Sequence, residues 1–230
     1  RGIREFREGD QDPEGIIITH AHYDHIAGMA QVFKRTNWVF YTRPETRDHL
    51  LKTHPEWVQY EHRIIMLNDR ILSLKGVSVS WVSLQHRSQL NSPESGCGDH
   101  IGLRFNFEGQ KLAYITDCGT LAQDQLTLIK DCHAYVMEAN HDVSLLNSSP
   151  RPYHVRQRIL SEFGHLSNDQ TATYLKALVD PDNTQLVMLA HLSQECNRSD
   201  LAIRTVKQSL KGMDIHITTR CGQRYGRFRV

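Results

Sequence analysis

The sequence lacks several features that would assign it to a well-defined class of protein. Its five cysteines are odd in number and form no Cys-x-x-Cys pair, so neither a disulfide framework nor a zinc ribbon is indicated. No apolar run approaches the roughly 20 residues that span a bilayer, and no charged-then-apolar leader opens the chain. These absences predict a protein of a reducing, cytoplasmic setting without a membrane partner.

The sequence also has no large excess of basic or of acidic residues. Lys and Arg total 27 against 26 Asp and Glu, so no field of the whole molecule would attract a polyanion. Any affinity for nucleic acid must therefore come from local patches. The 39% of hydrophobic and 23% of charged residues are ordinary for a soluble globular protein, and residues 1–230 are predicted to form a single domain.

Histidine is the residue that the sequence has in unusual number, with 14 copies. It is the commonest metal ligand among the side chains and the one that titrates nearest neutral pH. A metal site is therefore expected where several histidines gather at the ends of the expected strands.

Short apolar runs that indicate strands alternate with segments of helical spacing. Strands are expected at residues 15–19, 38–41, 71–84 (as a hairpin), 101–107, 111–116, 134–137 and 186–189, with two short ones within 215–230. Helices are expected at residues 26–35, 44–52, 121–130, 168–179 and 200–210, the last two capped by Ser167 and Ser199. Hairpin connections between the strands favour a mixed α/β sandwich over a doubly wound parallel sheet.

The densest cluster of ionisable side chains follows the first expected strand. Residues 19–25 read Thr-His-Ala-His-Tyr-Asp-His, which places three imidazoles and a carboxylate within six residues. On a tight turn, alternate side chains converge on one point and the next pair can aim at a second, which suits two metal ions about 3.5–4 Å apart. Imidazole nitrogen and carboxylate oxygen favour zinc first and manganese second. The alternative is a solvated, histidine-rich turn.

This pattern, His-x-His-x-Asp-His after an apolar strand, resembles the signature of the metallo-β-lactamase superfamily, whose fold is an α/β sandwich of the αββα type. Histidine and aspartate also follow later strands where that family keeps its ligands, at His86, Asp117 and His191. The resemblance implies two divalent cations: the first held by His20, His22 and His86, the second by Asp24, His25 and His191, with Asp117 bridging the two. It further implies a hydroxide shared by the cations as the nucleophile, and catalytic roles for Asp24 and Asp117.

His100 is a rival for His86 in this scheme. It precedes an expected strand and could face the same pocket. The simpler interpretation is a histidine at the start of a strand without a ligand role.

Three further stretches, at residues 137–142, 164–168 and 190–194, are closely similar to the YycJ/WalJ (VicX-like) branch of the superfamily. The match runs from about Gly15 to Leu210. Members of that branch are described as 5′-to-3′ DNA exonucleases, and the branch resembles tRNase Z and the phosphoribosyl cyclic phosphodiesterases. The resemblance implies a binuclear phosphodiesterase whose partner is nucleic acid, DNA in preference to RNA, and it raises the option of a homodimer.

Those relatives use a histidine before the penultimate helix to bind the scissile phosphate or protonate the leaving oxygen, and His165 matches it. The helix capped by Ser167 begins beside it, and a helix N-terminus favours phosphate. The alternative is a loop histidine without chemistry. Four residues after the strand at 134–137 are expected either to orient the ligands and His165 or to form a structural turn: Glu138, Asn140, His141 and Asp142.

Two basic stretches could contact a polynucleotide. Arg151, His154, Arg156 and Arg158 are spaced along an expected helix, where Tyr153 could stack on a base. The C-terminal stretch combines arginines with aromatics: Arg220, Arg224, Tyr225, Arg227, Phe228 and Arg229. A solvated basic face and a protected edge strand are the alternatives. The residues proposed for substrate binding are His165, Ser167, Asn140, His141 and Arg156.

The sequence departs from the family in two places. Members open with two to four strands and a Gly-Ser-rich loop before the histidine motif, which this chain reaches at His20. The domain is therefore expected to lack the first N-terminal strands of the family. Arg87 stands where relatives often have an acidic residue.

The sequence is compatible with other functions as well. The alternative substrates are an RNA precursor, as for tRNase Z, and a cyclic or other small phosphodiester. A thioester hydrolase of the glyoxalase type would leave the His165 segment without a role. A non-enzymatic metal-binding module fits poorly, because all seven expected ligands are present.

Overall fold

The structure of the chain is a computed structural model that describes residues 13, 15–69, 71–86 and 98–219. The predictions for Arg87 and for the C-terminal arginines and aromatics at 220–230 lie outside these residues. None of the described helices is long and apolar enough to cross a membrane.

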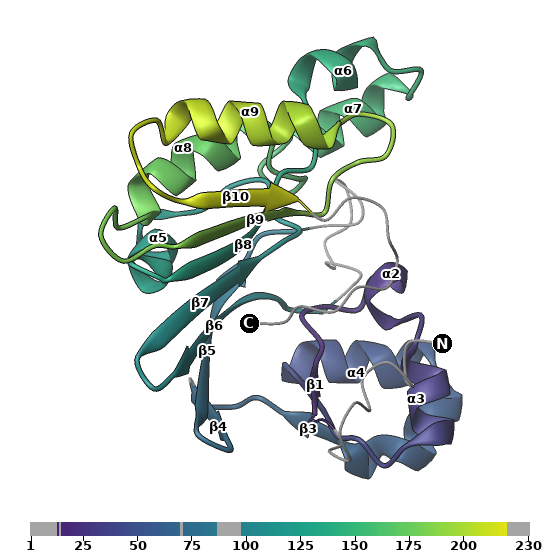
Figure 1. The fold of residues 1–230 in the computed structure, drawn as a ribbon. Helices are drawn as coiled ribbons and strands as arrows, with labels where there is room; N and C mark the ends of the chain where they lie inside the picture. The colour runs from purple at the N-terminus through teal and green to yellow at the C-terminus, as the bar shows by residue number, and fades with distance from the viewer. Residues whose placement is uncertain (1–12, 14, 70, 87–97, 220–230) are drawn as a thin grey trace.

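The described residues form two β-sheets that face each other between layers of helices (Figure 1). The smaller sheet has three parallel strands in the order β1-β2-β3. Their bounds are β1 Ile16–Ile17, β2 Phe40–Thr42 and β3 Ile64–Met66. The larger sheet has seven strands in the order β10-β9-β8-β7-β6-β5-β4. Their bounds are β4 Ile71–Leu74, β5 Val77–Leu84, β6 His100–Phe107, β7 Gln110–Ile115, β8 Ala134–Glu138, β9 Leu186–Ala190 and β10 His216–Thr219.

Helices cover the outer face of each sheet, which confirms the predicted αββα sandwich. The larger sheet is covered by α5 (Gln123–Ile129), α8 (Asn168–Leu178) and α9 (Ser199–Ser209). Beside the smaller sheet lie α3 (Met29–Arg35), α4 (Pro44–Thr53) and the 3-10 helix η1 (Pro55–Arg63). Three short helices lie in connections: α2 (Tyr23–Ile26), α6 (Val143–Ser148) and α7 (Tyr153–Leu160).

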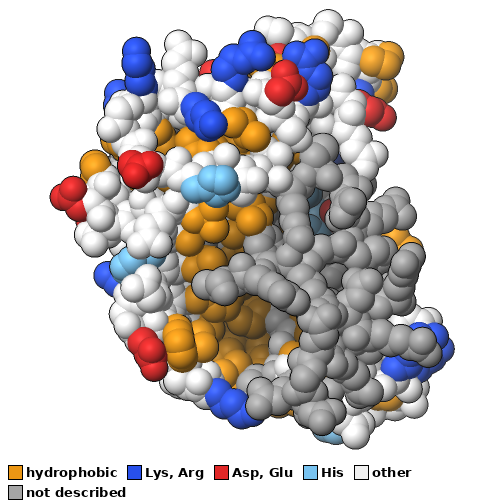
Figure 2. Space-filling model, in the orientation of Figure 1, with side chains coloured by type: hydrophobic (Ala, Val, Ile, Leu, Met, Phe, Trp, Pro, Cys, Tyr) orange, Lys and Arg blue, Asp and Glu red, His pale blue; other side chains and the backbone are white. Residues whose placement is uncertain are grey.

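The two sheets share an apolar interior. Ile17 and Tyr41 of the smaller sheet pack against a cluster that includes Ile101 and Leu103 of β6. A cavity of about 360 Å³ lies between the sheets. It is lined by Gly15, Ile17, Ile18, Thr19, His25, Leu103, Phe105 and Tyr114. In the space-filling view, hydrophobic side chains gather over the middle of the face that Figure 1 presents (Figure 2).

The strand directions bring the polar strand ends to one edge of the larger sheet. β6 runs antiparallel to both β5 and β7, and β7, β8 and β9 are mutually parallel. The ends of β5, β7, β8 and β9 therefore meet at the edge where β6 begins, as the pairing of Leu84 with His100 shows. A hydrogen bond from Ile101 N to Thr19 O (3.2 Å) attaches the end of the smaller sheet's first strand to the same edge.

Several local predictions were wrong in their bounds. The helix expected at 26–35 is divided into α2 and α3 near Gly28. Ser199 is the first residue of α9 rather than its cap, and the capping position is Arg198, which makes no side-chain cap. The strand β3 and the helices η1 and α6 were not expected. The prediction of a single domain over residues 1–230 stays a prediction.

Candidate metal centre

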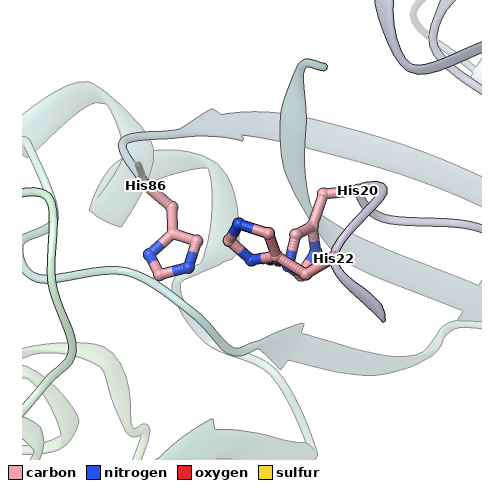
Figure 3. Close-up of side chains that lie close together, drawn as sticks. All are labelled: His20, His22 and His86. Carbon is pink, nitrogen blue, oxygen red and sulfur yellow. Dashed lines mark hydrogen bonds between the residues drawn. The ribbon is translucent and has the colours of Figure 1, made fainter. Parts of the chain in front are cut away.

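The first group of candidate ligands consists of His20, His22 and His86 (Figure 3). One ligand atom from each ring lies within 4.8 Å of the others. His20 Nε2 and His22 Nδ1 are 3.0 Å apart. Two nitrogens on one tetrahedral zinc, each at about 2.0–2.1 Å, would be separated by roughly 3.3 Å, so this spacing is close to what one cation requires.

Neighbouring groups orient two of these rings. His86 Nδ1 lies 3.1 Å from the carbonyl oxygen of Gly164, to which it can donate, leaving Nε2 for a ligand role. His20 Nδ1 lies 3.1 Å from Thr19 Oγ1. Burial lowers the pKa of both His20 and His86, that of His86 to about 3. Both rings are therefore neutral at physiological pH, which is the form that binds a metal.

The second group consists of Asp24, His25 and His191. Asp24 Oδ2 lies 3.5 Å from His25 Nε2 and 3.8 Å from His191 Nε2. The first two residues lie in α2, which follows β1, and the third directly follows β9. This group therefore exists only because the fold joins the two sheets at one edge.

Asp117 lies between the two groups. Its Oδ1 is 3.3 Å from His191 Nε2 and its Oδ2 is 3.3 Å from His25 Nε2, and it also forms a candidate group with His20 and His25. Burial alone would raise the pKa of this carboxyl, but the contacts with His25 and His191 hold it well below its usual value. This ionised carboxylate is 2% exposed, and apart from the ion-pair contact with His25 its Oδ2 has no hydrogen-bond partner among the described residues, which suits a divalent cation.

Two of these candidate ligands have left-handed backbone conformations. The φ angle is 60° at Asp117 and 54° at His191, a region that residues other than glycine adopt at a cost of about 1–3 kcal/mol. His191 directly follows β9 and Asp117 lies two residues after the end of β7, where this conformation turns the chain out of the sheet. Strain of this kind at two converging ligands is typical of a functional site.

Glu138, the last residue of β8, connects the second group to His165. Its Oε1 lies 2.6 Å from His191 Nδ1 and 2.9 Å from His165 Nδ1, while its Oε2 accepts the backbone N–H groups of Cys118 and Leu166. Burial alone would raise the pKa of Glu138, but the two imidazoles hold it down to about 2. The fully buried carboxylate is therefore ionised and fixes the Nδ1 side of both rings.

His165 thus lies beside the candidate ligands. Its Nδ1 is 4.0 Å from Asp117 Oδ1, and its ring centroid is 5.0 Å from that of His86 and 5.3 Å from that of His191. The loop that carries it packs tightly on the loop after Asp117, because a Cβ at Gly119 would lie 2.1 Å from Ser161 O. The side chain is 17% exposed, so a substrate could reach it.

Comparison with known proteins assigns the fold to a family. Residues 4–192 match the sequence model described as "Beta-lactamase superfamily domain". The chain belongs to this superfamily. The predicted class of hydrolase with a metallo-β-lactamase fold is therefore confirmed.

Two curated relatives from this superfamily carry the names that the sequence motifs suggested. The chain is 29% identical over 203 residues to exodeoxyribonuclease YycJ of Bacillus anthracis, an alignment that covers 87% of this chain and 72% of the relative. It is 25% identical over 216 residues to exodeoxyribonuclease WalJ of Streptococcus pneumoniae, covering 94% of this chain and 77% of the relative. The resemblance to the YycJ/WalJ branch is thereby confirmed.

Solved structures of the superfamily share the fold at low identity. Zn²⁺-bound PqqB of Methylobacterium extorquens superposes with a TM-score of 0.66 and 15% identity, covering 90% of this chain and 70% of PqqB. A diphosphatase of the PhnP family superposes with a TM-score of 0.60 and 16% identity, covering 94% of this chain and 73% of the other. At these identities the likeness concerns the fold alone.

The structure favours His86 over His100 as the third candidate ligand of the first group. His86 lies in the first group with His20 and His22, whereas His100 occurs in none of the candidate groups found among the described residues. His100 begins β6, is 4% exposed and donates through Nε2 to the Thr116 carbonyl oxygen (2.9 Å). Its ring lies 4.1 Å from that of His20, so it packs behind the first group.

The structure gives other partners to most of the residues expected to bind substrate. Asn140 Nδ2 donates to the carbonyl oxygen of His191 (2.9 Å), which holds the ligand-bearing turn. Ser167 caps α8 by accepting from Gln170 N, as its capping box predicts, and is 3% exposed. His141 is fully buried, and neither ring nitrogen has a hydrogen-bond partner among the described residues.

Two arginines of the expected basic face, Arg151 before α7 and Arg156 within it, have partners in the protein. Arg151 Nη2 pairs with Glu195 Oε2 at 2.8 Å, and Arg156 Nη1 donates to the carbonyl oxygen of Asn147. Tyr153 is 69% exposed at the start of the same helix. Of the residues expected to bind substrate, His165 is therefore the one placed directly beside the candidate ligands.

Proposed function

We propose that the chain is a binuclear metal-dependent phosphodiesterase that degrades DNA as an exonuclease from the 5′ end. The observation that carries the proposal is the shared contact of Glu138 Oε1 with His165 and His191. It ties the half-buried imidazole of His165, which lies outside the two cation groups above but forms a further candidate group with Asp117, Glu138 and His191, to the ligand that completes the second group. The names of the two exodeoxyribonuclease relatives support DNA as the substrate.

The residues that would hold the cations are the two groups already described, with zinc preferred because nitrogen donors predominate and manganese second. Asp117 would contact both cations, and His20, His22 and His86 would hold the first. Two such cations supply Lewis acidity toward phosphoryl oxygens and a water molecule of lowered pKa.

His165 is the candidate for the general acid. Because Glu138 accepts the proton on Nδ1, Nε2 is the atom left to face the substrate. A proton donated from Nε2 to the departing oxygen would neutralise the charge that develops there, which typically accelerates such a step by about 10²–10⁴-fold. Asp24 and Asp117 would contribute to catalysis by holding the cations in position during the reaction.

RNA processing is the second candidate for the substrate. Human tRNase Z, short form, shares the fold with a TM-score of 0.51 and 18% identity, which says nothing of the substrate of this chain. A hydroxyacylglutathione hydrolase of Serratia proteamaculans is 27% identical over 129 residues, about half of each chain. Thioester hydrolysis would give the Glu138–His165 pair no leaving oxygen of high pKa to protonate, so we favour a phosphodiester.

The test is a comparison of substrates with metal-loaded protein. We expect mononucleotides from 5′-phosphorylated DNA, duplex or single-stranded, and little cleavage of structured RNA or of a cyclic phosphodiester. A label at either end of the DNA identifies the polarity, because digestion from the 5′ end releases a 5′ label at once and a 3′ label last. Faster cleavage of RNA would replace the proposal with the second candidate.

Matched variants separate the activity from a contaminant. Asp24→Ala removes a ligand of the second group and should abolish cleavage and lower the metal content from two ions per chain toward one. His62→Ala removes an exposed histidine outside every candidate group and should change neither. Equal activity in Asp24→Ala and the wild-type protein would overturn the proposal.

A further inference from the structure

Tyr23 lies in the sequence between a member of the first candidate cation group and a member of the second. It is the first residue of α2 and follows His22, which belongs to the first group. It precedes Asp24, which belongs to the second. No other aromatic side chain in the sequence is directly flanked by two candidate ligands.

The Tyr23 side chain is 81% exposed, the most exposed of the large hydrophobic side chains that the structure describes. Among the described residues it has no ring contact and no side-chain hydrogen bond. Other aromatics of the same region are packed, as in the stacked rings of Phe33 and Tyr60, whose centroids are 4.7 Å apart. Tyr23 therefore presents its ring to solvent, while the two residues that flank it in the sequence belong to the cation groups.

We propose that Tyr23 is a stacking platform for the nucleobase next to the phosphodiester bond that is cleaved. This inference rests on the proposed function and adds a determinant of substrate recognition to it. A substrate phosphate held at the cation groups places the attached nucleoside within the reach of residues beside them. The phenol ring offers the flat, half-polar surface on which any base can stack, without selection for sequence.

Such a role suits an exonuclease that must accept every base. Hydrogen-bond recognition of base edges would impose a sequence preference, whereas every base has a π-face. Arg151 and Arg156 have partners within the protein, so a stacking contact beside the cations supplies affinity that those arginines do not.

The experiment compares Tyr23→Ala and Tyr23→Phe with the wild-type protein. Binding is measured by fluorescence anisotropy with a labelled, 5′-phosphorylated single strand whose phosphorothioate linkages resist cleavage. Loss of the ring should weaken binding by about 5- to 100-fold, while Tyr23→Phe, which keeps the ring, should bind within about 2-fold of wild type. Phe107→Ala is the matched control, because it removes a 47% exposed ring at the β6–β7 turn, at the opposite end of the strands.

A second substrate identifies the contact as stacking. A strand with abasic residues at its 5′ end should bind the wild-type protein and Tyr23→Ala equally well. With cleavable DNA, Tyr23→Ala should raise KM by the same 5- to 100-fold and change kcat by less than about 3-fold. Unchanged binding of the normal strand by Tyr23→Ala, or an equal loss with the abasic strand, would overturn the inference.

The two proposals fail in different ways. If the wild-type protein binds DNA through Tyr23 but does not cleave it, the proposed function fails, and of the inference only the stacking of Tyr23 on a base of bound DNA stands. If DNA is cleaved with the same KM by Tyr23→Ala, the proposed function stands and the stacking role is wrong. If the protein does not bind DNA at all, both are overturned.

Discussion

The carboxylate of Glu138 and the imidazole of His191 lie 2.6 Å apart at the point where two neighbouring parallel strands end. Glu138 is the last residue of β8, and its Oε1 also contacts His165. One buried carboxylate therefore orients a candidate metal ligand and the candidate proton donor together.

Replacement of Glu138 by glutamine should disturb the orientation of both the candidate ligand His191 and the candidate proton donor His165. Four donors converge on this side chain, namely two imidazole nitrogens and two backbone N–H groups. Glutamine offers a single oxygen, so its amide NH₂ must face two of the four donors. We expect Glu138→Gln to lower kcat by about 10²–10⁴-fold and metal affinity by about 10–100-fold. Enzyme kinetics and metal titration measure the two effects, and Glu195→Gln is the control at an exposed carboxylate.

Metal content should distinguish His86 from His100. We expect His86→Ala to bind one cation per chain, because it removes a member of the first group. His100→Leu should retain two cations but unfold at a lower temperature, because the Thr116 carbonyl oxygen loses its donor in a buried position. Elemental analysis and thermal unfolding provide the measurements. Loss of a cation from His100→Leu would show that the first group has been assigned to the wrong histidine.

Gly119 should tolerate no side chain. A Cβ there would lie 2.1 Å from Ser161 O, a backbone atom that cannot rotate away. We expect Gly119→Ala to destabilise the protein by about 1–3 kcal/mol. The variant should also lower kcat, because it forces the Asp117 and His165 loops apart. Gly28→Ala is the control, since its Cβ would meet no atom within 4 Å. A Gly119→Ala protein with wild-type stability would contradict the tight packing of these loops.

The stability of the metal-free protein should fall in mild acid. Burial lowers the pKa of His141 to about 4, whereas an unfolded chain has the ordinary value near 6.5. Below about pH 6.5 the unfolded state takes up a proton that the folded state refuses until about pH 4, so stability is full above this window and is lost as the pH falls through it. His86 and His100, with pKa values lowered to about 3 and about 4, act in the same direction.

A substitution at His141 isolates one part of this dependence. His141→Phe keeps a planar ring, removes the titration and removes two buried nitrogens that have no hydrogen-bond partner among the described residues. We expect the loss of stability between pH 7.5 and pH 5 to shrink by up to about 2 kcal/mol. Urea unfolding in the presence of a chelator at both pH values measures the change, with the exposed His62→Phe as control. An unchanged pH dependence in His141→Phe would show that His141 is protonated in the folded protein.

The part of the site that the sequence predicted is the part whose signal is local. Residues 20–25 follow one short apolar strand and bring four donors together within a single turn. His86, Asp117 and His191 were found by resemblance and by their positions after strands, and the fold brings all three to the same sheet edge. That they act as metal ligands stays a prediction.

The remaining features depend on contacts between distant segments. For Glu138, the sequence favoured a role in orienting ligands no more than a structural turn, because its partners His165 and His191 lie in later loops. The one available signal was a charged residue that ends an apolar strand. The left-handed backbone at Asp117 and His191 could not be predicted, because such a conformation is usually indicated by glycine and neither position has one. The strand β3 was missed because it has three residues, of which two are exposed.

The proximity of four candidate donors within residues 20–25 has a thermodynamic consequence. A chelator made from adjacent residues survives unfolding, so the denatured chain should keep an appreciable affinity for zinc. Because zinc would then bind the unfolded chain as well as the native protein, adding metal should raise the melting temperature by less than the affinity of the native protein alone would give. The same local chelator would let a nascent chain capture its first ion before the distant donors have been assembled.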